Sequence, residues 1–232
     1  MIGAPQPGAR LALYWAPELD DPLHRAGSAW LGRDAETGAA VPQPALPGHD
    51  LAALTADPRG YGLHATLKPP FHLRVSWAEA REAAGRLAAR LRPFDLPPLA
   101  VRDLEGFLAL RETAPCPPLR TLADACLESL DACRAPPDAA EVAKRRRVRL
   151  SPVQEANLER WGYPYVFNAW RFHVTLTRRL SAEEKAAVLP AAEDHLNRAA
   201  AVGARRVASL CLFTQSSPGA PFLIAERLPF GG

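Results

Sequence analysis

Apolar and polar side chains alternate in two short segments of similar pattern. In residues 63–68, Leu-His-Ala-Thr-Leu-Lys, and in residues 172–177, Phe-His-Val-Thr-Leu-Thr, every second residue is apolar. A β-strand points successive side chains to opposite faces. The pattern therefore predicts strands at about 64–67 and 172–177, each with an apolar face and a face that carries imidazole and hydroxyl groups. We expect Pro69 and Pro70 to break the first strand.

Each of these segments is followed by a signal that begins a helix. Residues 76–79 (Ser-Trp-Ala-Glu) and 181–184 (Ser-Ala-Glu-Glu) are capping boxes, in which the serine and the glutamate bind free amide groups at the helix start. The first helix is expected to end at Pro93. The second should extend to about Arg198, with a kink or a division at Pro190.

Hydrophobic runs and turn residues predict the other elements. We expect strands at residues 10–15, 99–101, 107–110, 207–213 and 222–225, helices at 22–31, 119–133, 139–146 and 151–161, a loop at 38–48 and a turn at 216–219. The order of histidine strand, capped helix and hairpin therefore occurs twice.

This repetition indicates one domain, over residues 1–232, that contains two related halves. The first half spans about 50–112 and the second about 165–230. A helical insert at about 115–162 separates them, and the strand at 10–16 is expected to complete a sheet. The mixture of strands and helices places the chain in the α+β class.

The composition narrows the class of protein. With 48% hydrophobic and 23% charged residues, the 232-residue chain is typical of an ordinary globular protein. Its net charge of +3 does not by itself indicate a nucleic-acid binder, although a cleft can concentrate positive charge for an anionic ligand. Residues 1–15 lack a secretory signal, and no apolar run is long enough to span a membrane. The four cysteines lack metal-like spacing and are interpreted as buried thiols, so we expect a cytoplasmic protein.

The two histidine strands present a plausible set of groups for acid–base chemistry. Histidine titrates near neutral pH, so His64 and His173 could share the roles of base and acid at a phosphodiester. Thr66 and Thr175 could donate hydrogen bonds to the phosphate oxygens. No carboxylate–histidine cluster suits a metal ion, so we predict neither a metal nor a cofactor. The alternative is that both histidines are core residues with backbone partners and that both threonines reflect strand propensity.

Further residues are candidates for the substrate pocket. Lys68 and Thr177 are expected on the same faces as the histidines, Tyr61 precedes the first of them, and Arg33 lies near Trp30. Each also has a structural interpretation: a solvated strand end for Lys68, or packing at the strand entry for Tyr61. The basic run Lys144-Arg145-Arg146-Arg147, with Arg149, is either a solvated helix face or a rim that steers phosphate or RNA.

At these motifs the sequence resembles the 2H phosphoesterase superfamily, whose members carry two His-x-Thr/Ser motifs. It is most similar to the 2H-like family of putative phosphonate-metabolism proteins of phosphonate operons. The stretches that carry the resemblance are residues 13–17 (Leu-Tyr-Trp-Ala-Pro), 30–34 (Trp-Leu-Gly-Arg-Asp), 57–68 (Asp-Pro-Arg-Gly-Tyr-Gly-Leu-His-Ala-Thr-Leu-Lys), 161–165 (Trp-Gly-Tyr-Pro-Tyr) and 172–177. Leu63 departs from the family pattern, which has an aromatic residue there.

The resemblance implies a bilobal α+β fold, in which two antiparallel sheets line a central cleft and the helices lie outside. It also implies metal-independent hydrolysis of a cyclic phosphodiester of a sugar or nucleotide, and the operon association favours a ribosyl cyclic phosphate over an RNA end. The partner would be a small phosphorylated substrate. The acid and base roles, the direction of ring opening and the oligomeric state stay open.

Two other functions compete with this hypothesis. A non-catalytic module could hold an RNA end or a nucleotide in the same cleft, and the basic run at 144–149 motivates this alternative. A ligase that forms 2′-5′ RNA links would run the reaction backwards. Turnover of cyclic phosphates and analysis of RNA products distinguish the three.

Overall fold

The computed structural model describes residues 9–202 and 205–232, and it is built around one antiparallel sheet. Seven strands follow the order β4-β5-β6-β2-β1-β8-β9, and β3 and β7 form a separate two-stranded sheet. The α+β class predicted from the sequence is confirmed. The strands are β1 (Arg10–Trp15), β2 (Ala65–His72), β3 (Phe94–Leu96), β4 (Leu99–Leu104), β5 (Phe107–Glu112), β6 (Val174–Thr175), β7 (Arg205–Val207), β8 (Ser209–Gln215) and β9 (Leu223–Pro229).

The seven-stranded sheet has two wings that meet at one residue pair. One wing is β2-β1-β8-β9 and the other is β4-β5-β6, and β2 pairs with β6 through Ala65 and Val174. The two antiparallel sheets expected from the resemblance are therefore joined edge to edge. The hairpins are exchanged: β2 lies in the wing that contains the late hairpin β8-β9, whereas β6 pairs with the early hairpin β4-β5.

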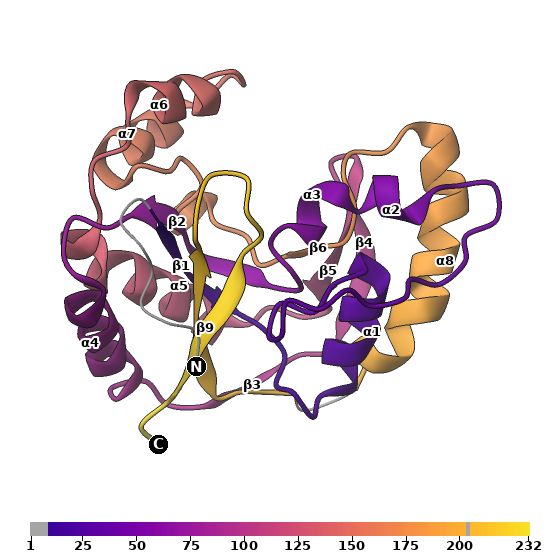
Figure 1. Ribbon diagram of the computed structural model, residues 1–232, viewed down its shortest axis with the longest axis horizontal. Helices are drawn as coiled ribbons and strands as arrows, with labels where there is room; N and C mark the ends of the chain where they lie inside the picture. The colour runs from indigo at the N-terminus through magenta and orange to yellow at the C-terminus, as the bar shows by residue number, and fades with distance from the viewer. Residues whose placement is uncertain (1–8, 203–204) are drawn as a thin grey trace.

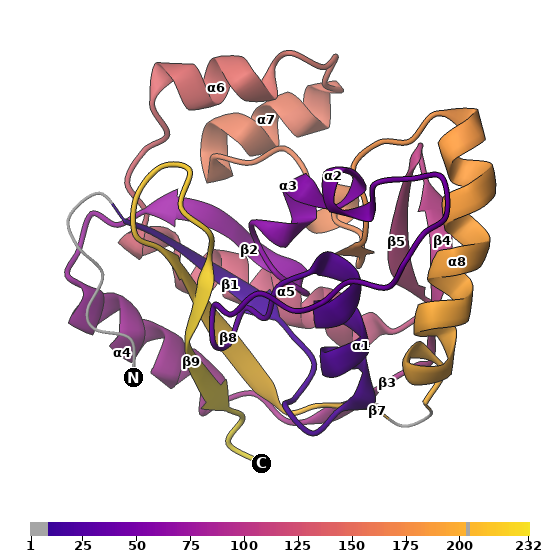
Figure 2. The same cartoon turned by 45° about the vertical axis from the view of Figure 1, so that its right-hand side comes forward.

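Helices cover the outer sides of both wings (Figures 1 and 2). Helix α8 packs on β4 with α1 beside it, and α5 packs on β2 with α4 beside it. Helices α6 and α7 protrude at the end of the β2 wing, and α6 buries no residue. The helices are α1 (Pro22–Leu31), α2 (Leu51–Leu54), α3 (Ala56–Arg59), α4 (Trp77–Ala88), α5 (Pro117–Ser129), α6 (Ala139–Arg145), α7 (Pro152–Trp161) and α8 (Ala182–Ala200), with 3-10 turns η1 (Asp131–Cys133) and η2 (Phe167–Ala169).

The two histidine strands differ from their expected lengths. Strand β2 runs through Pro69 and Pro70 to His72, so the expected break at the prolines is wrong. The register between β1 and β2 shifts on either side of Leu13, where irregular pairing tolerates residues without an amide N–H. Strand β6 has only two residues. Each histidine lies immediately before its strand, His64 before β2 and His173 before β6.

Both expected capping boxes are present, at α4 and α8. Helix α8 continues through Pro190 as a single element, so it is not divided there. The sequence analysis missed α2, α3 and β3, whose three or four residues are too short for a helical or strand period to be recognised. None of the described helices is both long enough and apolar enough to cross a lipid bilayer.

Two tryptophans brace the histidine segments from outside the sheet. The indole N–H of Trp30, in α1, donates a buried hydrogen bond to the Leu176 carbonyl oxygen at 3.1 Å. The indole N–H of Trp170 donates to the Thr66 carbonyl oxygen at 2.8 Å. Each segment is thereby tied to a neighbouring part of the chain by a side chain that also fills apolar space.

We predict that Trp30→Phe lowers the free energy of unfolding by about 1–3 kcal/mol, because the buried Leu176 carbonyl loses its donor. Urea unfolding followed by circular dichroism measures the change. Trp161→Phe is the matched control, since the Trp161 indole has no hydrogen-bond acceptor among the described residues and contacts the Arg160 guanidinium through its ring. An equal loss in both variants would show that the hydrogen bond to Leu176 contributes nothing of its own.

Candidate functional site

A cavity of about 300 Å³ lies over the junction of the two wings. Its wall contains residues from both histidine segments and aromatic residues from β1, β5 and the loop before β2. These residues include Tyr14, Tyr61, His64, Thr66, Phe107 and Thr175. His173 adjoins this wall, since its ring packs edge-on against Phe107 with 6.1 Å between centroids.

Strand register brings the two motifs together. Because Ala65 pairs with Val174 in an antiparallel ladder, one step along the strands places His64 beside Thr175 and Thr66 beside His173. Each histidine therefore neighbours the threonine of the other motif. The predicted apolar faces are buried as expected: Leu63, Ala65 and Leu67 on one side, and Phe172, Val174 and Leu176 on the other.

Both imidazoles are held by the same local hydrogen bond. His64 Nδ1 lies 2.9 Å from the Gly62 carbonyl oxygen, and His173 Nδ1 lies 2.9 Å from the Arg171 carbonyl oxygen. A carbonyl oxygen only accepts, so each Nδ1 must carry a proton and donate it. In the neutral ring Nε2 is then the unprotonated nitrogen. The two histidines are thus fixed in the same tautomer, with Nε2 available to take up a proton.

His64 stands in an aromatic environment. Its ring stacks on Tyr14, with 4.0 Å between centroids and an interplanar angle of 28°, and on Tyr61 at 5.7 Å and 27°. Burial in these surroundings lowers the pKa of His64 to about 4, against a smaller opposing effect of the hydrogen bond to Gly62. A charge on His173 would lower it further, so the two rings are within electrostatic reach of each other. His64 is therefore neutral at physiological pH.

His173 is desolvated as well, but its charged neighbours differ. Burial lowers the pKa of His173, the hydrogen bond to Arg171 raises it, and Arg111 lowers it further. The β5–β6 register pairs Leu110 with Val174, which places Arg111 directly beside His173. Arg111 is itself paired with Glu112 at 3.3 Å. The two histidines thus share a tautomer while only one of them has an ion pair at its side.

The threonines of the two motifs differ from the third candidate threonine. Within the described residues, the hydroxyls of Thr66 and Thr175 have no hydrogen-bond partner, and both line the cavity. Thr177 lines it too, but its Oγ1 accepts a hydrogen bond from the Leu108 N–H at 3.0 Å. Thr66 and Thr175 are therefore free to bind an anion, whereas Thr177 fixes the β5–β6 edge and retains only its hydroxyl proton to donate.

For Tyr61 the sequence left two positions open, one in the substrate pocket and one packed at the strand entry. Tyr61 lines the cavity, and its ring stacks on Phe222 with 5.1 Å between centroids and an angle of 14°. His64 and Tyr61 form an aromatic wall at the cavity, and the buried Phe222 stacks behind Tyr61. Such a wall offers a flat surface to a sugar or a base.

Lys68 does not share the face of His64, so that expectation is wrong. Tyr14 pairs with Thr66 and Leu13 pairs with Lys68, so one extra residue of β2 lies between the two pairs. A bulge of this kind reverses the alternation beyond it. Lys68 therefore points toward α5, where its ammonium group donates to the Leu127 carbonyl oxygen at 2.8 Å.

Arg33 does not line the cavity either, which corrects the second pocket candidate. Its guanidinium donates to the carbonyl oxygens of Arg59 and Phe222, and the side chain is 7% exposed. Arg33 thus joins the loop before His64 to the start of β9. It therefore supports the aromatic wall from behind. The sequence pattern alone could not distinguish this supporting position from a position in the pocket.

Among the wall residues, Tyr14 was not singled out from the sequence, and Arg145 was named only as part of the basic run. Tyr14 could have been found from the alternation in β1, because Leu11, Leu13 and Trp15 share the opposite face. Arg145 belongs to the basic run but comes from the protruding helix α6, and it lies over the Tyr163 ring at 4.6 Å. Its presence at the cavity depends on tertiary packing that the sequence pattern did not show.

Comparisons with known proteins place the chain among relatives. A family model described as "Protein of unknown function (DUF1045)" matches residues 66–223. Two curated relatives carry the name Ribose 1,5-bisphosphate phosphokinase PhnN. The protein of Janthinobacterium sp. (strain Marseille) is 40% identical over 231 residues, and that of Laribacter hongkongensis (strain HLHK9) is 37% identical over 219 residues.

The matches differ in how much of each protein they cover. They include 96% and 94% of this chain but 51% of each relative, so the chain spans about half the length of the curated relatives it matches. Among solved structures, E. coli LigT complexed with NADP+ is similar with a TM-score of 0.45 and 17% identity, over 97% of this chain and 99% of that one.

Gly62, which supplies the acceptor for His64, gives a testable constraint. It has φ +79°, and a Cβ built there would lie 2.4 Å from the Cβ of Ala35. We predict that Gly62→Ala lowers the free energy of unfolding by about 1–3 kcal/mol, measured by urea titration. Gly48→Ala is the matched control, because Gly48 has φ +77° but nothing within 4 Å. Equal losses would assign the effect to backbone strain and exclude the clash with Ala35.

Proposed function

The chain belongs to the DUF1045 family of proteins of unknown function, and we propose that it is a metal-independent phosphoesterase of the 2H type that hydrolyses a cyclic phosphodiester. The observation that carries the proposal is the pair of histidines in the same tautomer, each beside the threonine of the other motif. Two imidazoles with available Nε2 atoms, His64 in the cavity wall and His173 beside it, fit a reaction that needs one base and one acid.

In the proposed reaction, His64 is the base and His173 is the acid. His64 Nε2 takes a proton from a water molecule, and the water oxygen forms a bond to phosphorus. The bond from phosphorus to one ring oxygen breaks, and that oxygen receives a proton from His173. The products are a phosphomonoester and a free hydroxyl. The assignment rests on environment, since the aromatic rings around His64 favour its neutral form.

Thr66 and Thr175 are proposed to hold the phosphate. Their hydroxyls have no partner among the described residues, and they flank the two histidines across the β2–β6 junction. Donors that are already in position stabilise the negative charge on the non-bridging oxygens in the transition state. Arg145 contributes positive charge at the same cavity, which favours an anionic substrate.

The substrate class proposed is a cyclic phosphate of ribose or of a nucleotide, with ribosyl cyclic phosphate favoured. The aromatic wall next to His64 suits a sugar ring. The relatives' printed name contains a ribose phosphate, the kind of product that opening a ribosyl cyclic phosphate would yield. That name also contains a kinase activity. The 232 residues hold no Gly-x-x-x-x-Gly-Lys-Ser/Thr motif for a nucleoside triphosphate.

We predict that His64→Ala and His173→Ala each lower kcat on cyclic phosphates by about a hundredfold or more, because each removes one proton transfer. Adenosine 2′,3′-cyclic phosphate and ribose 1,2-cyclic phosphate are assayed in the presence of EDTA, with phosphomonoester formation followed by ³¹P NMR. His49→Ala is the control, since His49 lines neither this cavity nor the one beside it.

Three results would contradict the proposal. If turnover is unchanged in both histidine variants, His64 and His173 are not the catalytic pair. If EDTA abolishes turnover, the protein is a metal enzyme. Tight, salt-dependent binding of RNA by wild type without turnover of any cyclic phosphate favours the non-catalytic module.

The pH dependence provides a further prediction. The base must be deprotonated, so kcat/KM should rise as the pH passes the His64 pKa of about 4. The acid must be protonated, and burial holds the pKa of His173 below its ordinary value of about 6.5. As the pH rises through this lowered pKa, kcat/KM should therefore fall again. A stopped assay across pH 3–9 is expected to give a bell on the acidic side of neutrality. A maximum well above pH 7 would refute these assignments.

A further inference from the structure

A second cavity, of about 190 Å³, adjoins the first on the other side of Tyr61. The two cavities share Tyr61, Pro69, Pro70 and Arg145 in their walls. The second lies between β2 and the segment from α5 to α7, so it is on the side to which the β2 bulge turns Lys68. The two cavities are therefore adjacent, as a ligand that occupies both would require.

Positive charge dominates the wall of this second cavity. Its cations are Arg10, Lys68, Arg134, Lys144 and Arg145, and its one carboxylate is that of Glu141. Glu141 is engaged in a capping box, where it accepts from the backbone N–H of Asp138. Within residues 9–202 and 205–232, only Arg134 of these cations has a carboxylate within salt-bridge distance. The cavity thus carries a surplus of positive charge.

Lys68 is the most unusual member of this wall. The residue is 1% exposed, and its ammonium group has one hydrogen-bond acceptor, the Leu127 carbonyl oxygen. It also lies 5.2 Å from the centre of the Phe71 ring. Burial of an ammonium group without a paired anion is unfavourable, and here it lowers the pKa of Lys68 to about 8. A bound anion would offset this penalty.

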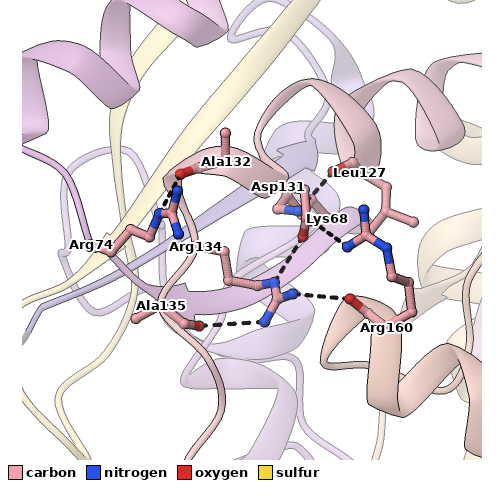
Figure 3. Close-up of polar contacts among 8 residues, drawn as sticks. All are labelled: Lys68, Arg74, Leu127, Asp131, Ala132, Arg134, Ala135 and Arg160. Atoms are coloured by element: carbon pink, nitrogen blue, oxygen red, sulfur yellow. Dashed lines mark hydrogen bonds and ion pairs between the residues drawn. The ribbon is translucent and has the colours of Figure 1, made fainter.

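The carboxylate that raises the pKa of Lys68, that of Asp131, is already committed to other partners, as Figure 3 shows. Asp131 accepts from Arg134 at 3.0 Å and from Arg160 at 2.7 Å. Asp131 has one negative charge, and Arg134 and Arg160 have two positive charges between them. This group of three residues is therefore positive even without Lys68. Asp131 therefore fixes the arginines, and although it raises the pKa of Lys68, burial lowers that pKa by more.

We propose that this cavity binds a phosphomonoester group carried by the same substrate, with Lys68 and Arg145 as its charged ligands. The inference rests on the proposed function, because the first cavity must hold the cyclic phosphodiester. The enzyme would then act on a sugar or nucleotide with two phosphates, one cyclic and one terminal. A phosphomonoester has up to two negative charges and three terminal oxygens, so it matches several cations around a small cavity better than an internal phosphodiester does.

The first experiment compares substrates in matched pairs. Ribose 1,2-cyclic phosphate and adenosine 2′,3′-cyclic phosphate are each assayed with and without a phosphate on the 5 position. We expect the added phosphate to raise kcat/KM at least about tenfold in wild type, the effect of one or two charged hydrogen bonds. The ratio should fall to near one in Lys68→Met and in Arg145→Gln. Arg147→Gln, which removes one charge from the same basic run outside both cavities, should retain the wild-type ratio.

A dinucleotide with a 2′,3′-cyclic end tests the other source of a second phosphate. Its 5′ neighbour is a phosphodiester, with one charge and no terminal third oxygen. Turnover of the dinucleotide that equals or exceeds that of the 5′-phosphorylated mononucleotide would overturn the assignment to a phosphomonoester and point to RNA ends.

A binding measurement separates failure of this inference from failure of the proposed function. Ribose 5-phosphate is titrated by calorimetry into the His64→Ala/His173→Ala double variant, which lacks the catalytic imidazoles. Addition of Lys68→Met should weaken binding at least about tenfold. If binding depends on Lys68 but wild type turns over no cyclic phosphate, the proposed function is refuted and the anion site is retained. Turnover with a substrate ratio of one would leave the function and refute the site.

The thermal stability of Lys68→Met distinguishes anion binding from a structural role. Methionine has a similar length and no charge to bury, so the ligand-free variant should unfold at the wild-type temperature or above it. Wild type should gain stability from inorganic phosphate and the variant should gain less. If Lys68→Met retains the full phosphate-induced increase, the inference is wrong, whatever its ligand-free stability.

Discussion

The pairing of Ala65 with Val174 is the contact on which the candidate site depends. It is the residue pair at which the two wings of the seven-stranded sheet are joined, and it lies at the centre of both His-x-Thr motifs. A shift of one residue in this register would turn one motif toward the apolar core and leave the other on the cavity side. The buried faces of both segments, from Leu63 to Leu67 and from Phe172 to Leu176, oppose such a shift. Hydrophobic burial thereby fixes the positions of polar groups on the opposite face.

The local environment of the histidines follows from the same arrangement. Residues that meet at a junction between two wings are surrounded by protein on several sides, and both imidazoles are desolvated as a result. The carbonyl partners at Gly62 and Arg171 orient the rings without introducing a negative charge. Positive groups such as Arg145 and Lys68 line the cavities and outnumber the carboxylates there, which are Asp57 in the first cavity and Glu141 in the second. The site is therefore ordered, uncharged at its centre and surrounded by cations, which suits an anion whose own charge completes the balance.

The sequence supported the predictions that depend on local patterns. Alternation identified the buried apolar faces of both histidine segments, and the capping boxes at Ser76 and Ser181 located two helix starts. It could not reveal the bulge that turns Lys68 away from His64, because a bulge is defined by the partner strand. For the same reason Pro69 and Pro70 were interpreted as a break, although β2 accommodates them where its pairing is irregular. Arg33 was predicted as a pocket residue but does not line the cavity, whereas Arg145 does. Packing between segments far apart in the chain decides which arginine reaches a cavity, and the sequence pattern does not show that packing.

The exchanged hairpins have a consequence for how this protein is made. Strand β1 is synthesised before the other strands of the sheet, yet it lies between β2 and β8, and its Arg10 bonds to Gln215 at a separation of 205 residues. One edge of β1 must therefore stay unpaired in the nascent chain until β8 has been synthesised. Folds dominated by such distant pairings form slowly and expose strand edges on the way. The native sheet can thus be completed only after translation of its last hairpin.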